Sequence, residues 1–450
     1  MKHDLLLAIF LFSSPFLVAQ GEQVITAARV KETVSWLASD ERLGRDTPSP
    51  GLEAAADWIG ARFAKAGLEQ VVKDSWFQVY SLPGVELDST TISLSVRMTV
   101  GDKTTTCTLK ADEDVCILRA GEAAGGQDQE ATVAYADDPR IERLLLAGGS
   151  RRPTVLEVPA DHASFVAAKG KRCVLKARLL GSAPVFLVKQ GLLPAGVETA
   201  QYFVNWSAPQ PAAIDIPLRN VVACIRGASK PDEYVVVSSH YDHIGTGRAV
   251  DGDGIYNGAD DDASGTTAVI LLAEAMARGP TPARTVVFVC FSGEEKGLRG
   301  SAAFAKAPPV PLAKVVANVN IEMIGRPEPG KEHSAWITGH EYSDFAEIAS
   351  AALQKAGIQT IDFAMAKQLF GASDNMSLAR EGVVAHSISA GSLHKDYHQP
   401  SDDVSKLDIE HMTAVILGLK AVVREFADRP DRPRYNEQGL ELLGSTKPRK

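Results

Sequence analysis

The feature that most restricts the fold is an alternation of short apolar runs and helical patterns between residues 219 and 426. The runs NVVACI, YVVVSSH, RTVVFVCF and KVVANVNIEMIG have the length and the β-branched content of buried strands. Helical patterns follow them over residues 266–277, 342–356 and 407–426. Strands that alternate with helices are typical of a mostly parallel sheet covered by helices on both faces. The sequence therefore predicts an α/β fold.

A change of character at residues 85–212 indicates a second unit within the 450-residue chain, which is longer than one typical domain. Thr, Val and Ser alternate there with apolar residues, as in TTISLSVRMTV, and Gly-rich turns intervene. This pattern predicts short strands in a β-rich inserted domain. The expected organisation is a discontinuous main domain, the insert and a flexible, Pro- and Arg-rich tail: 22–84 with 213–430, 85–212, and 431–450.

The first 21 residues have the three parts of a secretory signal peptide. Lys2 supplies a positive charge, residues 5–12 are apolar, and Ala19 and Gly21 are small residues at the expected cleavage site. The apolar run is too short to span a membrane, so we expect export to the periplasm or the medium and a mature protein without a membrane span. An uncleaved N-terminal anchor is the alternative.

Charge and cysteine content restrict the partners and the redox chemistry. The net charge of −9 argues against nucleic acid as a partner, because phosphate binding favours a basic face.

None of the cysteines forms a CxxC pair, and Cys224 and Cys290 lie within apolar strand patterns typical of packed thiols. Cys107 and Cys116 flank an expected hairpin, and an exported protein can oxidise such a pair.

Side chains that bind metals follow three of the expected strands at the point where each strand ends. His240 ends YVVVSSH, Glu294 and Glu295 follow RTVVFVCF, and Glu322 follows KVVANVNI. In a parallel sheet these ends lie side by side, at the edge where ligands of α/β proteins bind. We therefore expect these side chains to meet.

Two more candidate ligands lie in loops. Asp261 precedes a helix N-terminus, where the helix dipole favours a carboxylate, and His398 lies between the last strand and the last helix. Together with the strand-end residues they supply two imidazoles, three carboxylates and a spare acid, Glu294. Two metal ions that share a bridging carboxylate require about this set. Mixed imidazole and carboxylate ligands favour two Zn²⁺ ions, with Mn²⁺ or Co²⁺ as substitutes.

The order and spacing of six motifs resemble the zinc exopeptidase family (clan MH) of bacterial leucine aminopeptidases, aminopeptidase Y and glutamate carboxypeptidases. The motifs are HYDHIG, GADDDASG, FSGEEKGLRGS, NVNIEMIG, SDN and DYHQPSDD, and the opening helices are also similar, so the resemblance covers residues 30–80 and 218–425. It implies the zinc exopeptidase fold and a dizinc metallopeptidase that hydrolyses peptide bonds at the amino terminus of peptides. The position of residues 85–212 implies an insert of the protease-associated type.

The resemblance also implies how the ligands are divided. Asp261 is the bridging ligand. His240 and Glu322 are the other ligands of one zinc, and Glu295 and His398 those of the second. The family usually has Asp where Glu322 stands, and the extra methylene allows a longer reach or bidentate binding.

Three further roles follow from the resemblance. Glu294 is the general base that activates a metal-bridging water, and Asp242 orients His240 by accepting its other ring N–H. Tyr397 stands where the family has a tyrosine that stabilises the oxyanion, with ordinary packing as the alternative. Asp374, in SDN, either supports the floor of the site or caps a helix. Neighbouring acids and histidines are expected to be loop, cap or core residues rather than ligands: Asp260, Asp262, His243, His386 and His394.

Other functions remain open on the same residues. A carboxypeptidase or dipeptidase requires a cation that reads a substrate carboxylate, for which Arg299, Arg326 and Lys395 are candidates, although such cations are more often solvated or paired. A glutaminyl cyclase-like acyl transfer uses one zinc on a related fold, which the five-ligand set disfavours. A binding protein descended from a peptidase would be expected to have lost ligands, and this chain keeps them.

Overall fold

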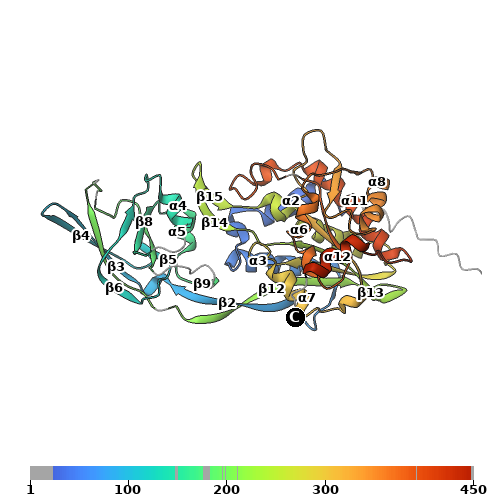
Figure 1. Ribbon diagram of the computed structural model, residues 1–450, viewed down its shortest axis with the longest axis horizontal. Helices are drawn as coiled ribbons and strands as arrows, with labels where there is room; N and C mark the ends of the chain where they lie inside the picture. The colour runs from blue at the N-terminus through green and yellow to red at the C-terminus, as the bar shows by residue number, and fades with distance from the viewer. Residues whose placement is uncertain are drawn as a thin grey trace, which may run out of the picture.

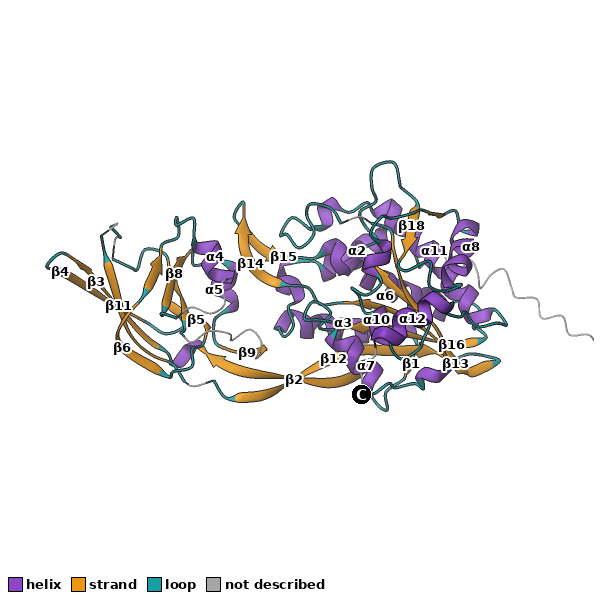
Figure 2. Ribbon diagram, in the orientation of Figure 1, coloured by secondary structure: helices purple, strands orange, loops and turns teal. Residues whose placement is uncertain are grey.

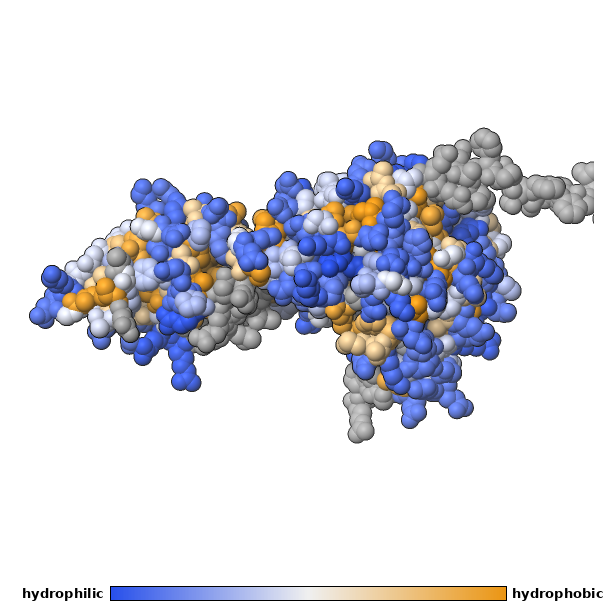
Figure 3. Space-filling model, turned by 90° about the horizontal axis from the view of Figure 1, so that it is seen from above, coloured by the Kyte–Doolittle hydropathy of each residue, from blue (hydrophilic) through white to orange (hydrophobic). Residues whose placement is uncertain are grey.

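The structure is a computed structural model that describes residues 24–146, 151–175, 183–194, 196–197, 199–209, 211–391 and 393–446. Figure 1 shows an elongated molecule with two lobes, one a sheet surrounded by helices and the other made mainly of strands. Seen from above, the lobes remain distinct and meet at a narrower waist (Figure 3). The expected signal peptide lies outside the described residues.

The larger lobe is organised around a mixed sheet whose central strands are parallel. Its strands are β1 (Glu69–Gln70), β2 (Phe77–Asp88), β9 (Lys171–Leu175), β12 (Ala213–Ile225), β13 (Lys230–His240), β16 (Arg284–Phe291), β17 (Val315–Glu322), β18 (Ser334–Ile337), β19 (Gln359–Thr360) and β20 (Ala385–Ser389). Their order is β19, β18, β20, β17, β13, β16, β12, β2, β9, and β1 pairs with β12. Strands β16, β13, β17 and β20 run parallel, whereas β12 runs antiparallel to β16 and β18 runs antiparallel to β20.

Helices cover both faces of this sheet, as predicted. One face packs against α2 (Ala27–Leu37), α3 (Pro50–Ala66), α6 (Gly265–Ala277), α8 (Phe345–Lys355) and α11 (Ile409–Asp428). The other face packs against Phe304 of α7 (Arg299–Lys306), Met376 of α10 (Asn375–Ala379) and Leu443 of α12 (Glu437–Thr446). A short helix, α9 (Ala366–Leu369), completes this lobe. The predicted α/β fold with a mostly parallel central sheet is confirmed.

Local sequence signals explain where these helices lie. The first twelve residues of α6 are all buried, which is typical of a helix that is apolar on every side and lies inside a large core. Helix α3 begins after Ser49, whose side chain accepts the N–H of Leu52, and Pro50 occupies its first position. It ends at Gly67, which has the left-handed conformation that glycine adopts without strain.

The smaller lobe contains two further sheets, in agreement with the expected β-rich insert. One has the order β5 (Val115–Arg119), β10 (Val185–Lys189), β8 (Thr154–Val158), β7 (Thr132–Ala134). The other has the order β4 (Lys103–Leu109), β3 (Ser93–Val100), β11 (Gln201–Ser207), β6 (Gly125–Glu130). The long antiparallel pair β2–β12 continues from the larger lobe into this one (Figure 2).

The expected hairpin between Cys107 and Cys116 is not formed. Cys107 lies in β4, which pairs with β3, whereas Cys116 lies in β5, which pairs with β10. Both thiols are free. Cys116 is buried in the core beneath α4 (Ile141–Leu146) and α5 (Ala163–Ala167). Cys107 packs instead against a separate apolar core. The two side chains therefore belong to different cores, and the suggested disulfide is wrong.

A hairpin of the larger lobe reaches the insert. Strands β14 (Gly245–Val250) and β15 (Asp253–Tyr256) form a separate pair that contacts α4 and α5 (Figure 2). This hairpin connects the loop after β13 with the loop that carries Asp261. The insert thus packs on a segment that joins two parts of the expected metal site.

The expectation of a flexible tail is wrong for residues 431–446. The Tyr435 hydroxyl donates to the carbonyl of Val383 at 2.9 Å and accepts the N–H of Ala385 at 3.1 Å. Helix α12 follows, and its Leu443 is 5% exposed. Apolar residues in an otherwise polar segment thus hold it against β20. Residues 447–450 lie outside the described residues.

Within the described chain, none of the helices combines the length and the apolar character that crossing a bilayer requires.

Candidate functional site

The strand-end residues converge at one edge of the parallel sheet. His240 is the last residue of β13 and Glu322 the last of β17, while Glu294 and Glu295 follow β16 after two intervening residues. Because β16, β13 and β17 are adjacent and parallel, their carboxyl ends lie side by side. Loops that precede α6 and α11 bring in Asp261 and His398.

The carboxylate of Asp261 lies between two groups of side chains. Its Oδ1 is 3.3 Å from Nε2 of His240, and its Oδ2 is 3.1 Å from Nε2 of His398. On the first side, Oε2 of Glu322 is 3.5 Å from the same His240 nitrogen. On the second side, Oε1 of Glu295 is 3.3 Å from the His398 nitrogen. The structure thus brings together the expected ligands in the expected two groups, with Asp261 common to both.

The donor atoms of each group fit a zinc ion. Asp261 forms one group with His240 and Glu322 and another with Glu295, His398 and His243, and the ligand atoms of each group lie within 4.8 Å of one another. Imidazole nitrogen and carboxylate oxygen are the donors that zinc commonly takes in catalytic sites. One carboxylate oxygen of Asp261 faces each group, as a carboxylate that bridges two ions requires.

Glu294 and Glu295 are adjacent in sequence but lie in different electrostatic environments. Burial, the nearby Asp374 and neighbouring glutamates raise the pKa of Glu294 well above its usual value. Burial and Asp261 also favour the neutral form of Glu295, but contacts with His243 and His398 outweigh them and lower its pKa to about 2. Glu295 therefore has the charged form that a ligand needs, whereas Glu294 holds a proton more readily than an exposed glutamate, as a residue that accepts a proton from water must.

Asp242 acts on a different group from the one expected. Nδ1 of His240 is 3.1 Å from the backbone carbonyl of Asp242, whereas the Asp242 carboxylate is 3.8 Å from it. That carboxylate accepts the backbone N–H of Glu294 at 3.1 Å and the hydroxyl of Thr47 at 2.9 Å. The carbonyl therefore orients the imidazole, and the carboxylate fixes the loop that carries Glu294.

The longer side chain of Glu322 has a specific partner for each oxygen. Its Oε1 accepts the hydroxyl of Ser373, and the amide of Asn320 donates to the same oxygen at 3.3 Å. Its Oε2 faces His240. The extra methylene therefore leaves one oxygen for the metal group and places the other on Ser373, an arrangement for binding through a single oxygen.

Sequence analysis missed Arg45, which supports both halves of the site. Its guanidinium is fully buried and donates to the carbonyls of Tyr241 at 2.8 Å and Gly258 at 3.0 Å. It also donates to the carbonyls of Leu37 at 2.6 Å and Asn257 at 2.8 Å. Arg45 thus joins the residue after His240 to the loop before Asp261. Its only sequence signal is its place in LGRD within the opening segment, because nothing local indicates that the side chain is buried.

Sequence analysis also gave no role to Asp402, in the DYHQPSDD motif. Its carboxylate accepts the backbone N–H groups of Asp260 and Asp261, each at 3.1 Å. Burial and the nearby Asp260 raise the pKa of Asp402 to about 6. The residue holds the backbone of the shared ligand in place, four positions after His398.

Other expected residues lie around the centre. Tyr397 stacks on the ring of His398 with centroids 3.9 Å apart and is 37% exposed. Asp374 is fully buried and does not cap α10, and burial raises its pKa to about 7. Asp262 accepts the N–H of Gly265, the first residue of α6, as a cap does.

Two of the remaining histidines and two of the candidate cations have partners outside the ligand groups. Nε2 of His394 is 3.2 Å from Oδ2 of Asp260, and His386 is a core residue whose Nε2 forms a hydrogen bond with the hydroxyl of Ser343. Arg326 is paired with Asp396 at 2.9 Å, and Arg299 donates to the carbonyl of Lys296. His243, expected to be a loop residue, is fully buried beside Glu295.

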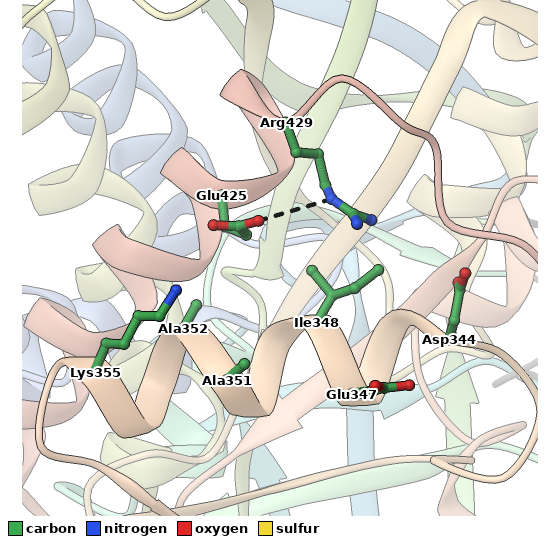
Figure 4. Close-up of a pocket in the computed structure, with 8 residues that line it drawn as sticks. All are labelled: Asp344, Glu347, Ile348, Ala351, Ala352, Lys355, Glu425 and Arg429. Atoms are coloured by element: carbon green, nitrogen blue, oxygen red, sulfur yellow. Dashed lines mark ion pairs between the residues drawn. The ribbon is translucent and has the colours of Figure 1, made fainter.

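A pocket of about 330 Å³ between α8 and α11 is separate from this centre. None of its lining residues belongs to either ligand group, and Figure 4 shows the ion pair of Glu425 and Arg429 at its wall. The chemistry therefore does not lie there.

Comparison with known proteins identifies relatives of the larger lobe. The model of "Peptidase family M28" matches residues 220–423. A "Probable zinc metalloprotease" of Pyrenophora teres f. teres is 34% identical over 110 residues, which are 24% of this chain and 23% of that protein. A "Probable leucine aminopeptidase" of Trichophyton verrucosum is 29% identical over 203 residues, which are 43% of this chain and 52% of that protein. The matches thus span between about a quarter and a half of these relatives.

Solved structures share the fold. The zinc aminopeptidase BSAP from Bacillus subtilis has a TM-score of 0.54 at 17% identity, over 90% of this chain and 96% of that one. An aminopeptidase from Aneurinibacillus sp. strain AM-1 has a TM-score of 0.50 at 16% identity, over 93% of this chain and 100% of that one. The residues that the family model matches, 220–423, include every member of both ligand groups. Residues 220–423, which carry all the candidate metal ligands, thus match peptidase family M28.

Proposed function

We propose that this chain is a dizinc metallo-exopeptidase that removes residues from the amino terminus of peptides. The observation that carries the proposal is the position of Asp261, whose two oxygens face two separate groups of imidazole and carboxylate ligands. Bound zinc ions supply Lewis acidity and lower the pKa of a water molecule that they hold. The names of the relatives, zinc metalloprotease and aminopeptidase, support this class of reaction.

The chain's own residues supply the proton transfer and the positioning. Glu294 has a raised pKa, so it is suited to take a proton from the attacking water and return it to the leaving amine. The Asp242 carboxylate fixes the backbone of Glu294, which keeps the base in reach of the centre. Tyr397, stacked beside His398, is the candidate hydroxyl donor to the developing oxyanion.

The other functions receive less support. A carboxypeptidase or dipeptidase needs a cation for the substrate carboxylate. Arg326 is paired with Asp396 and Arg299 donates to the carbonyl of Lys296, so exposed Lys395 is the candidate that remains. A glutaminyl cyclase-like reaction uses one zinc, whereas two ligand groups are present here. A binding protein without activity would not need the general base or its support.

The test is a substrate panel combined with metal analysis. Aminoacyl-p-nitroanilides, peptides blocked at the amino end and peptides amidated at the carboxyl end are incubated with the metal-loaded and the chelator-treated protein. The proposal expects two zinc ions per chain, hydrolysis of free amino-end substrates and indifference to carboxyl-end amidation. Turnover that requires a free carboxylate supports the carboxypeptidase alternative, and a single zinc with no peptidase activity contradicts the proposal.

We also propose that the protein is exported through residues 1–21, on the basis of their charge and apolar pattern. Amino-terminal sequencing of the protein from the culture medium, the periplasm and the membrane fraction tests this proposal. A chain that begins after Gly21 supports export, whereas an intact N-terminus in the membrane fraction supports the anchor.

A further inference from the structure

His243 lies beside the proposed metal centre, and neither nitrogen of its ring has a hydrogen-bond partner among the described residues. The side chain is fully buried, three residues after His240. Its backbone is fixed by a bridge to Asp46 and by an N–H that donates to the carbonyl of Arg45 at 3.2 Å. The position of the imidazole is therefore set by the fold.

The ring faces the same oxygens as His398. Nδ1 of His243 is 2.8 Å from Oε1 of Glu295 and 3.8 Å from Oδ2 of Asp261. Nε2 of His398 is 3.3 Å and 3.1 Å from these two atoms, and the rings meet edge to face at 5.5 Å. Two imidazole nitrogens thus approach the same pair of carboxylate oxygens.

This contact lacks the geometry of a hydrogen bond. Among the described residues, neither ring nitrogen of His243 has a hydrogen-bond partner, and neither does Oε1 of Glu295, although Nδ1 and Oε1 are close. The N–H direction of the ring therefore does not point at the oxygen. A buried polar group without a partner is costly, whereas two atoms that lie close without facing each other are typical of ligands that both face one ion.

The neighbouring backbone makes room for this ring. Gly258 has φ +57°, and a Cβ atom there would lie 2.4 Å from Cγ of His243 and 2.3 Å from the carbonyl oxygen of Asp261. Any side chain at this position would displace either the imidazole or the shared ligand. The glycine is thus required for His243 and Asp261 to lie next to each other.

We propose that His243 is a further ligand of the zinc held by Asp261, Glu295 and His398. This inference rests on the proposed dizinc centre and deepens it. One ion then has four protein ligands, while the other has His240, Asp261 and Glu322 and keeps a position open. Catalytic zinc can expand to five ligands, so four protein ligands leave the ion at His243 able to share the attacking water. With one protein ligand more than the other ion, it is bound the more tightly.

The test compares His243→Asn with wild type by metal titration. Asn keeps a polar side chain beside Glu295 but cannot replace an imidazole ligand. His340→Asn is the matched control, because His340 is exposed and outside both groups. Metal-free proteins are titrated with Zn²⁺ against a chromophoric chelator and with Co²⁺ by absorption spectroscopy.

Wild type and His340→Asn are expected to bind two ions in separate steps. His243→Asn is expected to weaken the tighter step by at least about 100-fold, which exceeds the usual effect of a residue that only orients a ligand, and to alter the Co²⁺ spectrum. Unchanged affinities in His243→Asn overturn the inference but leave the proposed function standing. Wild type that fails to bind two ions contradicts the proposed function itself.

A measurement on wild type keeps the inference testable if the variant does not fold. X-ray absorption spectra of the protein loaded with one equivalent of zinc report the number of imidazole ligands. Two imidazoles on the first ion support His243 as a ligand, and one imidazole overturns the inference.

Discussion

The carboxylate of Asp242 accepts the backbone N–H of Glu294 at 3.1 Å, so an acid at the end of one strand fixes the proposed base at the end of the next. Replacing Asp242 with Asn keeps the size of the side chain but removes the charge that strengthens this bond. We expect kcat to fall by about 10- to 100-fold, with little change in bound zinc, because the metal ligands remain. Steady-state kinetics and metal analysis check the prediction. Thr47→Val, which removes only the donor to the other oxygen, is expected to have a smaller effect.

Glu294 and Glu295 are expected to separate activity from metal binding. Glu294→Gln removes the proton acceptor and should lower kcat by about 10²- to 10⁴-fold while two zinc ions remain bound. Glu295→Gln should instead lose zinc, because Glu295 belongs to the group of Asp261 and His398. Each variant serves as the control for the other, because the same substitution is made at two adjacent positions. Loss of metal in Glu294→Gln would show that this residue is a ligand rather than the base.

The partner of Glu322 allows a test of its length. Glu322→Asp withdraws the carboxylate from both Ser373 and His240, so we expect weaker binding of the zinc held by the group of Glu322, by about 10-fold or more. Ser373→Ala removes one of the two donors to Oε1 and should weaken the binding of this zinc less. Competition with a chelator measures the zinc dissociation constant of each variant. Equal or tighter binding in Glu322→Asp would mean that the longer side chain does not set the geometry.

Arg45 is expected to be essential for stability. Arg45→Met removes a buried donor to four carbonyl groups and leaves them without partners, so we expect the free energy of unfolding to fall by about 3 kcal/mol or more. Urea unfolding of metal-free protein measures the change. Arg380→Met, at an exposed position, is the matched control and should change the stability little.

His386 should make stability depend on pH. Its ring is fully buried, Nδ1 lies 2.7 Å from the carbonyl of Thr338, and burial lowers its pKa to about 4 from the usual 6.5. As pH falls from 6.5 to 4, the unfolded chain binds a proton that the folded chain does not. Stability should therefore decrease across this window, by up to about 3 kcal/mol.

The variant His386→Gln cannot titrate and should show a shallower decrease between pH 6.5 and 4. Urea unfolding of the metal-free protein at several pH values measures the slope. An unchanged slope in His386→Gln would show that other groups cause the dependence.

The strands, the covering helices and most of the site could be predicted from the sequence, because their signals are local or positional. An apolar run such as RTVVFVCF predicts a buried strand by itself, and parallel strands must end at one edge. That rule predicts that His240, Glu295 and Glu322 meet. The packing of the tail has no such signal, because a few apolar residues such as Leu443 gain their role only from the surface on which they pack.

The sequence by itself determined which residue types meet at the sheet edge; the tertiary structure alone decided what each oxygen and nitrogen faces. The Asp242 carboxylate binds the backbone of Glu294 and not His240, and Arg45 joins two loops from a segment about 200 residues away. His243, expected to be a residue other than a ligand, lies buried beside Glu295. Burial and side-chain direction depend on contacts between distant segments, and such contacts have no local pattern in the sequence.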